Sequence, residues 1–132
     1  MKFRAICSEV NDMVILNKLL NILSKYGDDC ILKLSQDSFQ IISKQEGFTF
    51  VSELDVEEVF TDWKLVGVSE ELNMIFMDCS PASLSRALHS CQSNTTHAAM
   101  SLKIKLTRKR GMSCLTVRLI SCRYNSVLRT TL

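Results

Sequence analysis

The sequence has 132 residues, of which 46% are hydrophobic and 23% are charged, and these values favour one globular domain over intrinsic disorder. Four glycines and one proline exclude collagen-like and low-complexity sequence. No apolar run approaches the roughly 18 residues of a membrane span, and no signal peptide is recognisable. We therefore expect a soluble intracellular domain over residues 1–132, with no membrane partner.

The small net charge of +2 hides a strong asymmetry along the chain. Residues 1–78 hold all 14 acids and 7 of the 16 lysines and arginines, so their formal charge is −7. Residues 79–132 hold the other 9 basic residues and no acid, which gives +9. A basic segment of this length without any acid suggests a polyanionic partner. The alternative is a domain whose two halves neutralise each other across a sheet.

The first half alternates between the strand and helix periods. Residues 2–7 have period two, and residues 10–25 change to helical spacing, with Gly27 placed to form a left-handed cap. The expected apolar face of this helix comprises Val10, Met13, Val14, Leu16, Leu19, Leu20 and Leu23. Further strands are expected at residues 30–34, 39–43, 48–54 and 61–66.

The second half repeats this order. A strand is expected at 74–78, and Ser80 and Pro81 have the residue types of an N-cap and first helical position. The helix should run to about residue 92. Strands at 100–106 and 112–119, joined by a hairpin at 107–111, and a last strand at about 121–130 complete the pattern. The doubled order predicts an α+β fold with two β-α-β-β-β units, an antiparallel sheet and two helices on one of its faces.

The residues give little support for catalysis or metal binding. Six dispersed cysteines without a C-x-x-C pair favour reduced, mostly buried thiols. His89, Cys91 and His97 approximate zinc-ligand spacing only loosely, so no metal or cofactor is expected. A Cys–His pair would combine Cys79 or Cys91 with His89 or His97, and no orienting partner is evident. The acids Asp55, Glu57, Glu58 and Asp62 are expected to form a solvated loop.

Five short motifs are similar, in order, to one known family. They are Met1-Lys2-Phe3-Arg4-Ala5, Gly67-Val68-Ser69, Leu84-Ser85-Arg86-Ala87-Leu88, Leu102-Lys103-Ile104-Lys105-Leu106-Thr107 and Cys114-Leu115-Thr116-Val117. Together with the doubled pattern they resemble the first domain of the Hus-one subunit family of the nine-one-one DNA-damage checkpoint clamp. The similarity runs to about residue 120. The loop at 93–99 looks extended and residues 122–132 match poorly. The resemblance therefore predicts that residues 1–132 form a single clamp-type domain, the first of the two in the family, without the second.

The resemblance implies a non-enzymatic ring subunit whose helices face the DNA. Its DNA-facing residues would then be Lys18, Lys25, Arg86, His89, Asn17 and Asn21. Lys18 and Lys25 lie two turns apart on the polar stripe of the first helix, and such cations suit phosphate contact without base reading. The alternative is an ordinary solvated helix face.

Two further sites follow from the same pattern. The hairpin cations Arg108, Lys109 and Arg110 could touch DNA at the ring entrance, act as a nuclear-import patch, or only keep the turn soluble. Lys103 and Lys105 should point away from the helices. The resemblance implies that the last strand lies at a sheet edge and pairs with a neighbouring subunit. The residues expected at this subunit edge are Tyr124, Ser126, Val127 and Leu128.

The implied partners are the other two clamp subunits, the clamp loader, and double-stranded DNA bound without sequence preference. No small-molecule substrate is expected. The implied location is the nucleus, with the cytoplasm as an additional one. The alternative function is a truncated interaction module that binds the partner subunits without encircling DNA. The least favoured hypothesis is that the protein is a small thiol or hydrolytic enzyme.

Overall fold

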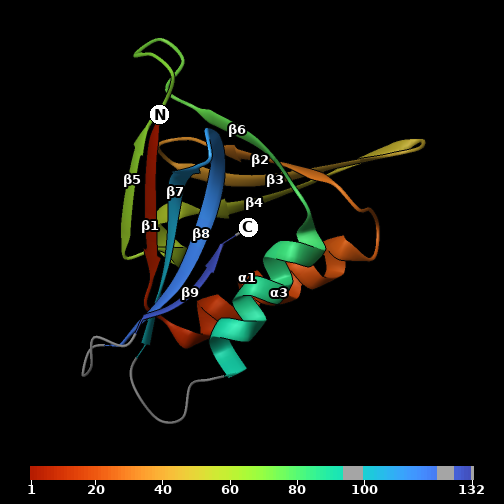
Figure 1. Ribbon diagram of the computed structural model, residues 1–132. Helices are drawn as coiled ribbons and strands as arrows, with labels where there is room; N and C mark the ends of the chain where they lie inside the picture. Colours follow the sequence, from red (N-terminus) through yellow and green to blue (C-terminus); the bar gives the residue numbers. More distant parts are fainter. Residues whose placement is uncertain (94–99, 122–126, 132) are drawn as a thin grey trace.

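The computed structural model describes residues 1–93, 100–121 and 127–131, and a β-α-β-β-β unit occurs twice along it (Figure 1). The first unit comprises β1 (Lys2–Cys7), α1 (Val10–Ser24), β2 (Cys30–Leu34), β3 (Ser38–Gln45) and β4 (Phe48–Asp55). Between the units lie α2 (Val56–Val59) and β5 (Asp62–Val66). The second unit comprises β6 (Ile75–Cys79), α3 (Pro81–Ser93), β7 (Met100–Lys109), β8 (Met112–Ser121) and β9 (Val127–Thr131).

The strands form two antiparallel sheets, whereas the sequence pattern predicted one. The five-stranded sheet has the order β5-β1-β7-β8-β9, and the four-stranded sheet has the order β4-β3-β2-β6. Each unit therefore contributes its first strand to the sheet that holds the last three strands of the other unit. Both α1 and α3 connect one sheet to the other. The α+β class, the doubled unit and the antiparallel pairing are confirmed.

One hydrophobic core joins both sheets and both long helices. The alternation predicted for β1 is present, with Phe3, Ala5 and Cys7 buried and the residues between them more exposed. The four-stranded sheet contributes Leu32, Leu34 and Ile41, while α1 and α3 contribute leucines that are almost completely buried. Burying a leucine stabilises the folded state by roughly 1.5–3 kcal/mol, so this shared core holds the two sheets together.

An aromatic cluster lies where the two sheets meet. The Trp63 ring of β5 contacts Phe3 at a centroid distance of 4.9 Å and Phe60 at 5.0 Å, and it lies 6.3 Å from Phe39 of β3. The Trp63 Nε1–H also donates a 2.9 Å hydrogen bond to the backbone oxygen of Ser35, in the turn between β2 and β3. Trp63 therefore connects the five-stranded sheet to the four-stranded one.

The ends of the helices agree with the sequence in one case and differ in another. Ser80 is the N-cap residue expected for α3, since its Oγ accepts a 3.3 Å hydrogen bond from the Ser83 backbone N–H. Gly27 does not have the positive φ of a left-handed cap, so that prediction is wrong. Gly27 lies against the side chain of Gln45 instead, and a Cβ atom at this position would collide with it. The colliding atom is the end of the flexible Gln45 side chain, which can move, so neither space nor backbone conformation requires glycine here.

Two connections differ in length from the expected ones. The β7–β8 hairpin closes through Arg110 and Gly111 alone, with φ angles of 50° and 79°, because Lys109 already pairs with Met112. Positive φ at both positions is characteristic of a tight type I′ turn, whose twist matches that of the strands. The acidic segment expected to be a loop contains α2, and Asp55 Oδ1 accepts a 2.9 Å hydrogen bond from the Glu57 N–H at its start.

Candidate functional site

The side chains predicted to face DNA lie on α1 and α3, which pack side by side (Figure 1). Lys18 and Asn21 are exposed on α1, Lys25 is the exposed C-cap residue of that helix, and Arg86 and His89 are exposed on α3. The helices direct their leucines toward the core, so helical periodicity leaves these polar groups on the opposite face. The structure thus brings five of the six predicted residues to one solvent-facing layer, which we call the helix face.

Asn17 has a different position from the other five residues. It is half-buried, and its Oδ1 accepts a 3.1 Å hydrogen bond from the Ser85 hydroxyl of α3. This bond joins the two helices. Asn17 therefore positions the helix face, and its amide oxygen is already engaged within the domain.

The apolar face expected for α1 is only partly correct. Met13, Leu16, Leu20 and Leu23 are buried as predicted. Val10 and Val14 are instead 66% and 37% exposed, and Ile15 and Ile22 are also exposed, at 53% and 48%. Helical spacing predicted a wider apolar stripe than the one that reaches the core, and the packing of α3 beside α1 leaves these four side chains exposed. The helix face is therefore a mixture of cations and apolar side chains.

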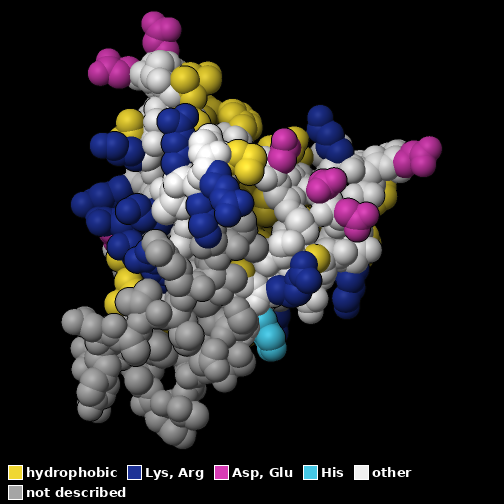
Figure 2. All heavy atoms as spheres, viewed as in Figure 1, with side chains coloured by type: hydrophobic (Ala, Val, Ile, Leu, Met, Phe, Trp, Pro, Cys, Tyr) yellow, Lys and Arg dark blue, Asp and Glu magenta, His cyan; other side chains and the backbone are white. Residues whose placement is uncertain are grey.

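Cations on the outer face of the five-stranded sheet were only partly anticipated. Lys103 and Lys105 point away from the core as predicted, because Leu102 and Ile104 are the buried residues of β7. Figure 2 shows lysine and arginine side chains gathered on the left of the view, where β5 and β1 lie. Strand pairing adds cations from distant segments, namely Arg4, Lys64 and Arg118, which the sequence analysis did not single out.

The basic hairpin lies at the end of this sheet rather than on the helix face. Arg108, Lys109 and Arg110 are all exposed, and Arg108 and Met1 line the same shallow depression. The hairpin therefore continues the cationic surface of the sheet. Its role at a ring entrance stays a prediction.

The last strand begins later than expected. β9 spans Val127–Thr131 and, within the described residues, pairs with β8 alone, at the end of the five-stranded sheet. Its pairing with a neighbouring subunit stays a prediction. Val127 and Leu128 belong to β9, whereas Tyr124 and Ser126 lie outside the described residues. At the end of the four-stranded sheet, β4 is a second edge strand, and it exposes Phe48, Phe50 and Val51.

The described cysteines are free thiols placed in or near the core. Cys30 and Cys79 are directly opposite each other across β2 and β6, and their mutual hydrogen bond lowers the pKa of Cys30 and raises that of Cys79. Cys79 and Cys114 line a pocket of about 370 Å³ whose described lining residues include no histidine. Nothing in this arrangement pairs a thiol with His89. Cys91, Cys122 and His97 have no described side chains.

Cys7 makes stability sensitive to alkaline pH. Its thiol is fully buried in β1, and burial, followed by the nearby charge of Asp12, raises its pKa to about 11 from 9.0. The unfolded thiol ionises near pH 9.0, so the stabilising contribution is complete below that pH and is lost as the pH rises to about 11.

We therefore expect the free energy of unfolding to fall by about 2–3 kcal/mol over this interval because of Cys7. Urea titrations across the interval, compared with those of Cys7→Ala, measure the effect, since the two proteins differ only at this thiol. The variant should lack this part of the pH dependence. If the free energy of unfolding fell equally with pH in both proteins, the loss of stability could not be assigned to Cys7.

No cluster of three or more potential metal-ligating side chains is present in residues 1–93, 100–121 and 127–131. No helix in the same part of the chain is long and apolar enough to span a membrane.

Comparison with known proteins identifies the family. Two intertwined β-α-β-β-β units, with cations on a pair of adjacent helices, are the architecture expected of a sliding-clamp domain. The model of the family described as Hus1-like protein matches residues 1–129. Checkpoint protein HUS1 of Homo sapiens is 36% identical over 124 residues, which cover 89% of this chain and 41% of the human protein. The chain belongs to the Hus1-like family, and it spans about two fifths of the length of this relative.

Proposed function

We propose that this chain serves as a domain of a DNA-damage checkpoint clamp subunit, a non-enzymatic scaffold that encircles duplex DNA in the nucleus and recruits checkpoint and repair factors. Family membership supports the clamp role. The observation that carries the DNA contact is the helix face, where Lys18, Lys25 and Arg86 are exposed on two adjacent helices. Flexible cations of this kind bind phosphates without reading bases.

The polarity of the helix face also suits a protein that moves along DNA. α3 contains no acidic residue, and the acid in the first turn of α1, Asp12, is half-buried away from the exposed lysines. The uncharged amide of Asn21 lies between the positions of Lys18 and Lys25. Along the two helices, duplex DNA would therefore meet little local repulsion, and the exposed acids beside this surface are Asp28 and Asp29, which line the same hollow as Lys25.

Assembly into a ring would use the open sheet edges. β9 leaves one edge of the five-stranded sheet available for strand addition by a neighbouring subunit, and β4 leaves an edge with exposed apolar side chains. A neighbouring strand at either edge would satisfy backbone hydrogen-bonding groups and cover apolar surface. The proposed partners are the other two clamp subunits, with the clamp loader placing the ring on DNA.

Size-exclusion chromatography with the other two clamp subunits tests this assembly. We expect this chain to co-elute with one or both of them, as a full-length subunit does in the control. The variant Leu128→Glu, which puts a charge on β9, should reduce co-elution, because charged residues on an edge strand disfavour pairing with another strand. Separate elution of the unmodified chain would contradict the ring role. Co-elution without DNA retention would favour an interaction module that binds the partners but does not encircle DNA.

A further inference from the structure

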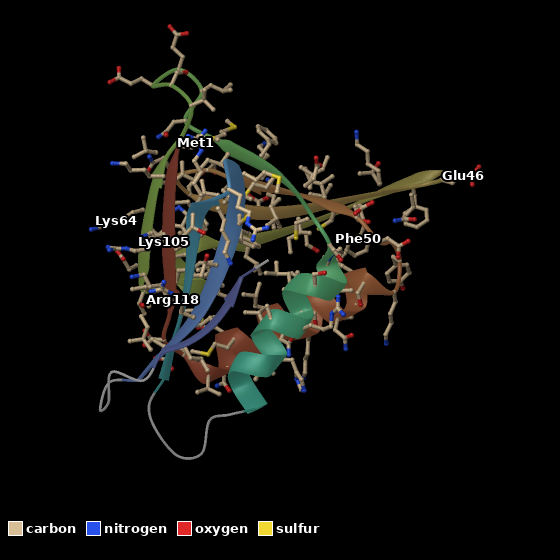
Figure 3. All side chains as sticks on the ribbon, viewed as in Figure 1. Met1, Glu46, Phe50, Lys64, Lys105 and Arg118 are labelled. Carbon is tan, nitrogen blue, oxygen red and sulfur yellow. The ribbon has the colours of Figure 1, made fainter. Side chains whose placement is uncertain are left out.

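The outer face of the five-stranded sheet concentrates positive charge beyond what the proposed clamp role uses. Arg4 of β1 is directly opposite Lys64 of β5 and Lys105 of β7, and Lys103 is directly opposite Arg118 of β8. Figure 3 shows Lys64, Lys105 and Arg118 on the side of the sheet away from the helices. We call this surface the sheet-face patch, and it comprises Lys2, Arg4, Lys64, Lys103, Lys105 and Arg118.

The sheet-face patch is poorly neutralised by the rest of the domain. Like charges directly opposite each other on neighbouring strands are destabilising. Asp62 supplies the one ion pair found within the described ranges, with its Oδ2 2.9 Å from Arg4 Nη2. The Arg4 Nε atom is buried and has no hydrogen-bond partner among the described residues. The two halves of the chain therefore do not neutralise each other here, and an anionic partner would relieve the repulsion.

A recess beside these cations has apolar walls as well as charged ones. It has a volume of about 540 Å³, within the usual range for ligand pockets, and lies on β5, β1 and β7. Met1 and Val66 line it and are 61% and 59% exposed, while Lys2, Arg4, Lys64 and Lys105 surround them. The aliphatic stems of the lysines extend this apolar surface. The recess can therefore hold an apolar side chain whose flanking residues are acidic.

We propose that the sheet-face patch binds an acidic peptide segment of a partner protein, with one apolar side chain of that segment in the recess. A phosphate backbone offers no apolar group for Met1 and Val66 to contact. Phe3 also lines the recess but is only 3% exposed, so it offers no exposed platform on which unpaired bases could stack. The distance from β5 to β8 is roughly 14 Å, which about four extended peptide residues span. This proposal does not depend on ring assembly.

Fluorescence anisotropy with the 132-residue chain tests the proposal. The probe is a short fluorescein-labelled peptide of aspartate and glutamate residues around one leucine, and a second probe has serine in place of leucine. We expect tighter binding of the leucine probe. Lys64→Glu combined with Lys105→Glu should weaken it by about tenfold or more. Val66→Ser should abolish the preference for leucine without changing binding of the serine probe.

Two comparisons make the result decisive. Lys18→Glu combined with Lys25→Glu changes the net charge by the same amount on the helix face, and we expect it to retain peptide binding. Equal losses in the two double variants would overturn the proposal, because binding would then follow net charge alone. A short DNA duplex is added as a competitor. The proposal would also be overturned if the duplex bound more tightly than the peptide and if its binding required Lys64 and Lys105. Circular dichroism checks folding, and the milder Lys64→Gln should show a smaller loss in the same direction.

Discussion

Replacement of Lys18, Lys25 and Arg86 together by glutamate is expected to weaken binding to duplex DNA by about 100-fold at low salt. Each cation that neutralises a phosphate releases counterions. In a plot of the logarithm of the affinity against the logarithm of the salt concentration, the three reversals should therefore make the slope shallower by about 3. All three side chains are exposed, so the fold should be unaffected. Fluorescence anisotropy over a salt series, with the assembled clamp and labelled duplex DNA, measures both quantities.

The matched control for this experiment is a triple reversal on the sheet-face patch. Lys64→Glu, Lys105→Glu and Arg118→Glu change the net charge by the same amount on the opposite surface. This control should bind duplex DNA nearly as well as the unmodified chain. If the two triple variants lose equal affinity, the helix face is not the specific DNA contact, and long-range attraction by net charge is the better explanation.

Trp63→Ala is expected to cause the largest loss of stability, about 3–5 kcal/mol in the free energy of unfolding. The indole ring contacts Phe3 and Phe60, and its Nε1–H donates to the Ser35 backbone oxygen, so its removal deletes contacts that join the two sheets. Urea unfolding followed by circular dichroism measures the change. A loss of about 5 kcal/mol would leave a marginally stable domain of this size largely unfolded.

Trp63→Phe separates the packing of the ring from its hydrogen bond. Phenylalanine keeps an aromatic ring in the cluster but removes the donor to Ser35, so we expect a loss of about 1 kcal/mol. A cost for Trp63→Ala no larger than that for Trp63→Phe would mean that the aromatic cluster does not hold the sheets together. The position of Trp63 would then matter mainly for its hydrogen bond.

The local elements of the fold could be predicted because each has a short-range cause. Apolar alternation predicted β1, and the hydroxyl of Ser80 before Pro81 predicted the start of α3. Boundaries differ where pairing extends a strand, as in β7, which continues to Lys109 because the turn needs only two residues. The short helix α2 was missed, because one helical turn has no periodicity to detect.

The candidate site was predictable only in part. Helical spacing placed Lys18, Lys25 and Arg86 on polar faces, and the structure has them exposed. The side-by-side packing that turns two faces into one surface depends on contacts such as Asn17 with Ser85, which are 68 residues apart. The exposure of Val10 and Val14 was equally hidden, since a helix pattern does not reveal which of its apolar side chains the neighbouring elements will cover.

By itself, the sequence determined the classes and order of the elements, the doubled unit, the dispersed cysteines and the family motifs. Each of these depends on residue type and on spacing along the chain. Only the tertiary structure decided that β1 pairs with β7 and β2 with β6, which divides the strands between two sheets. That pairing brings Arg4, Lys64 and Lys105 into adjacent positions. Strand order is set by the packing of one shared core, and this long-range free energy leaves no local pattern in the sequence.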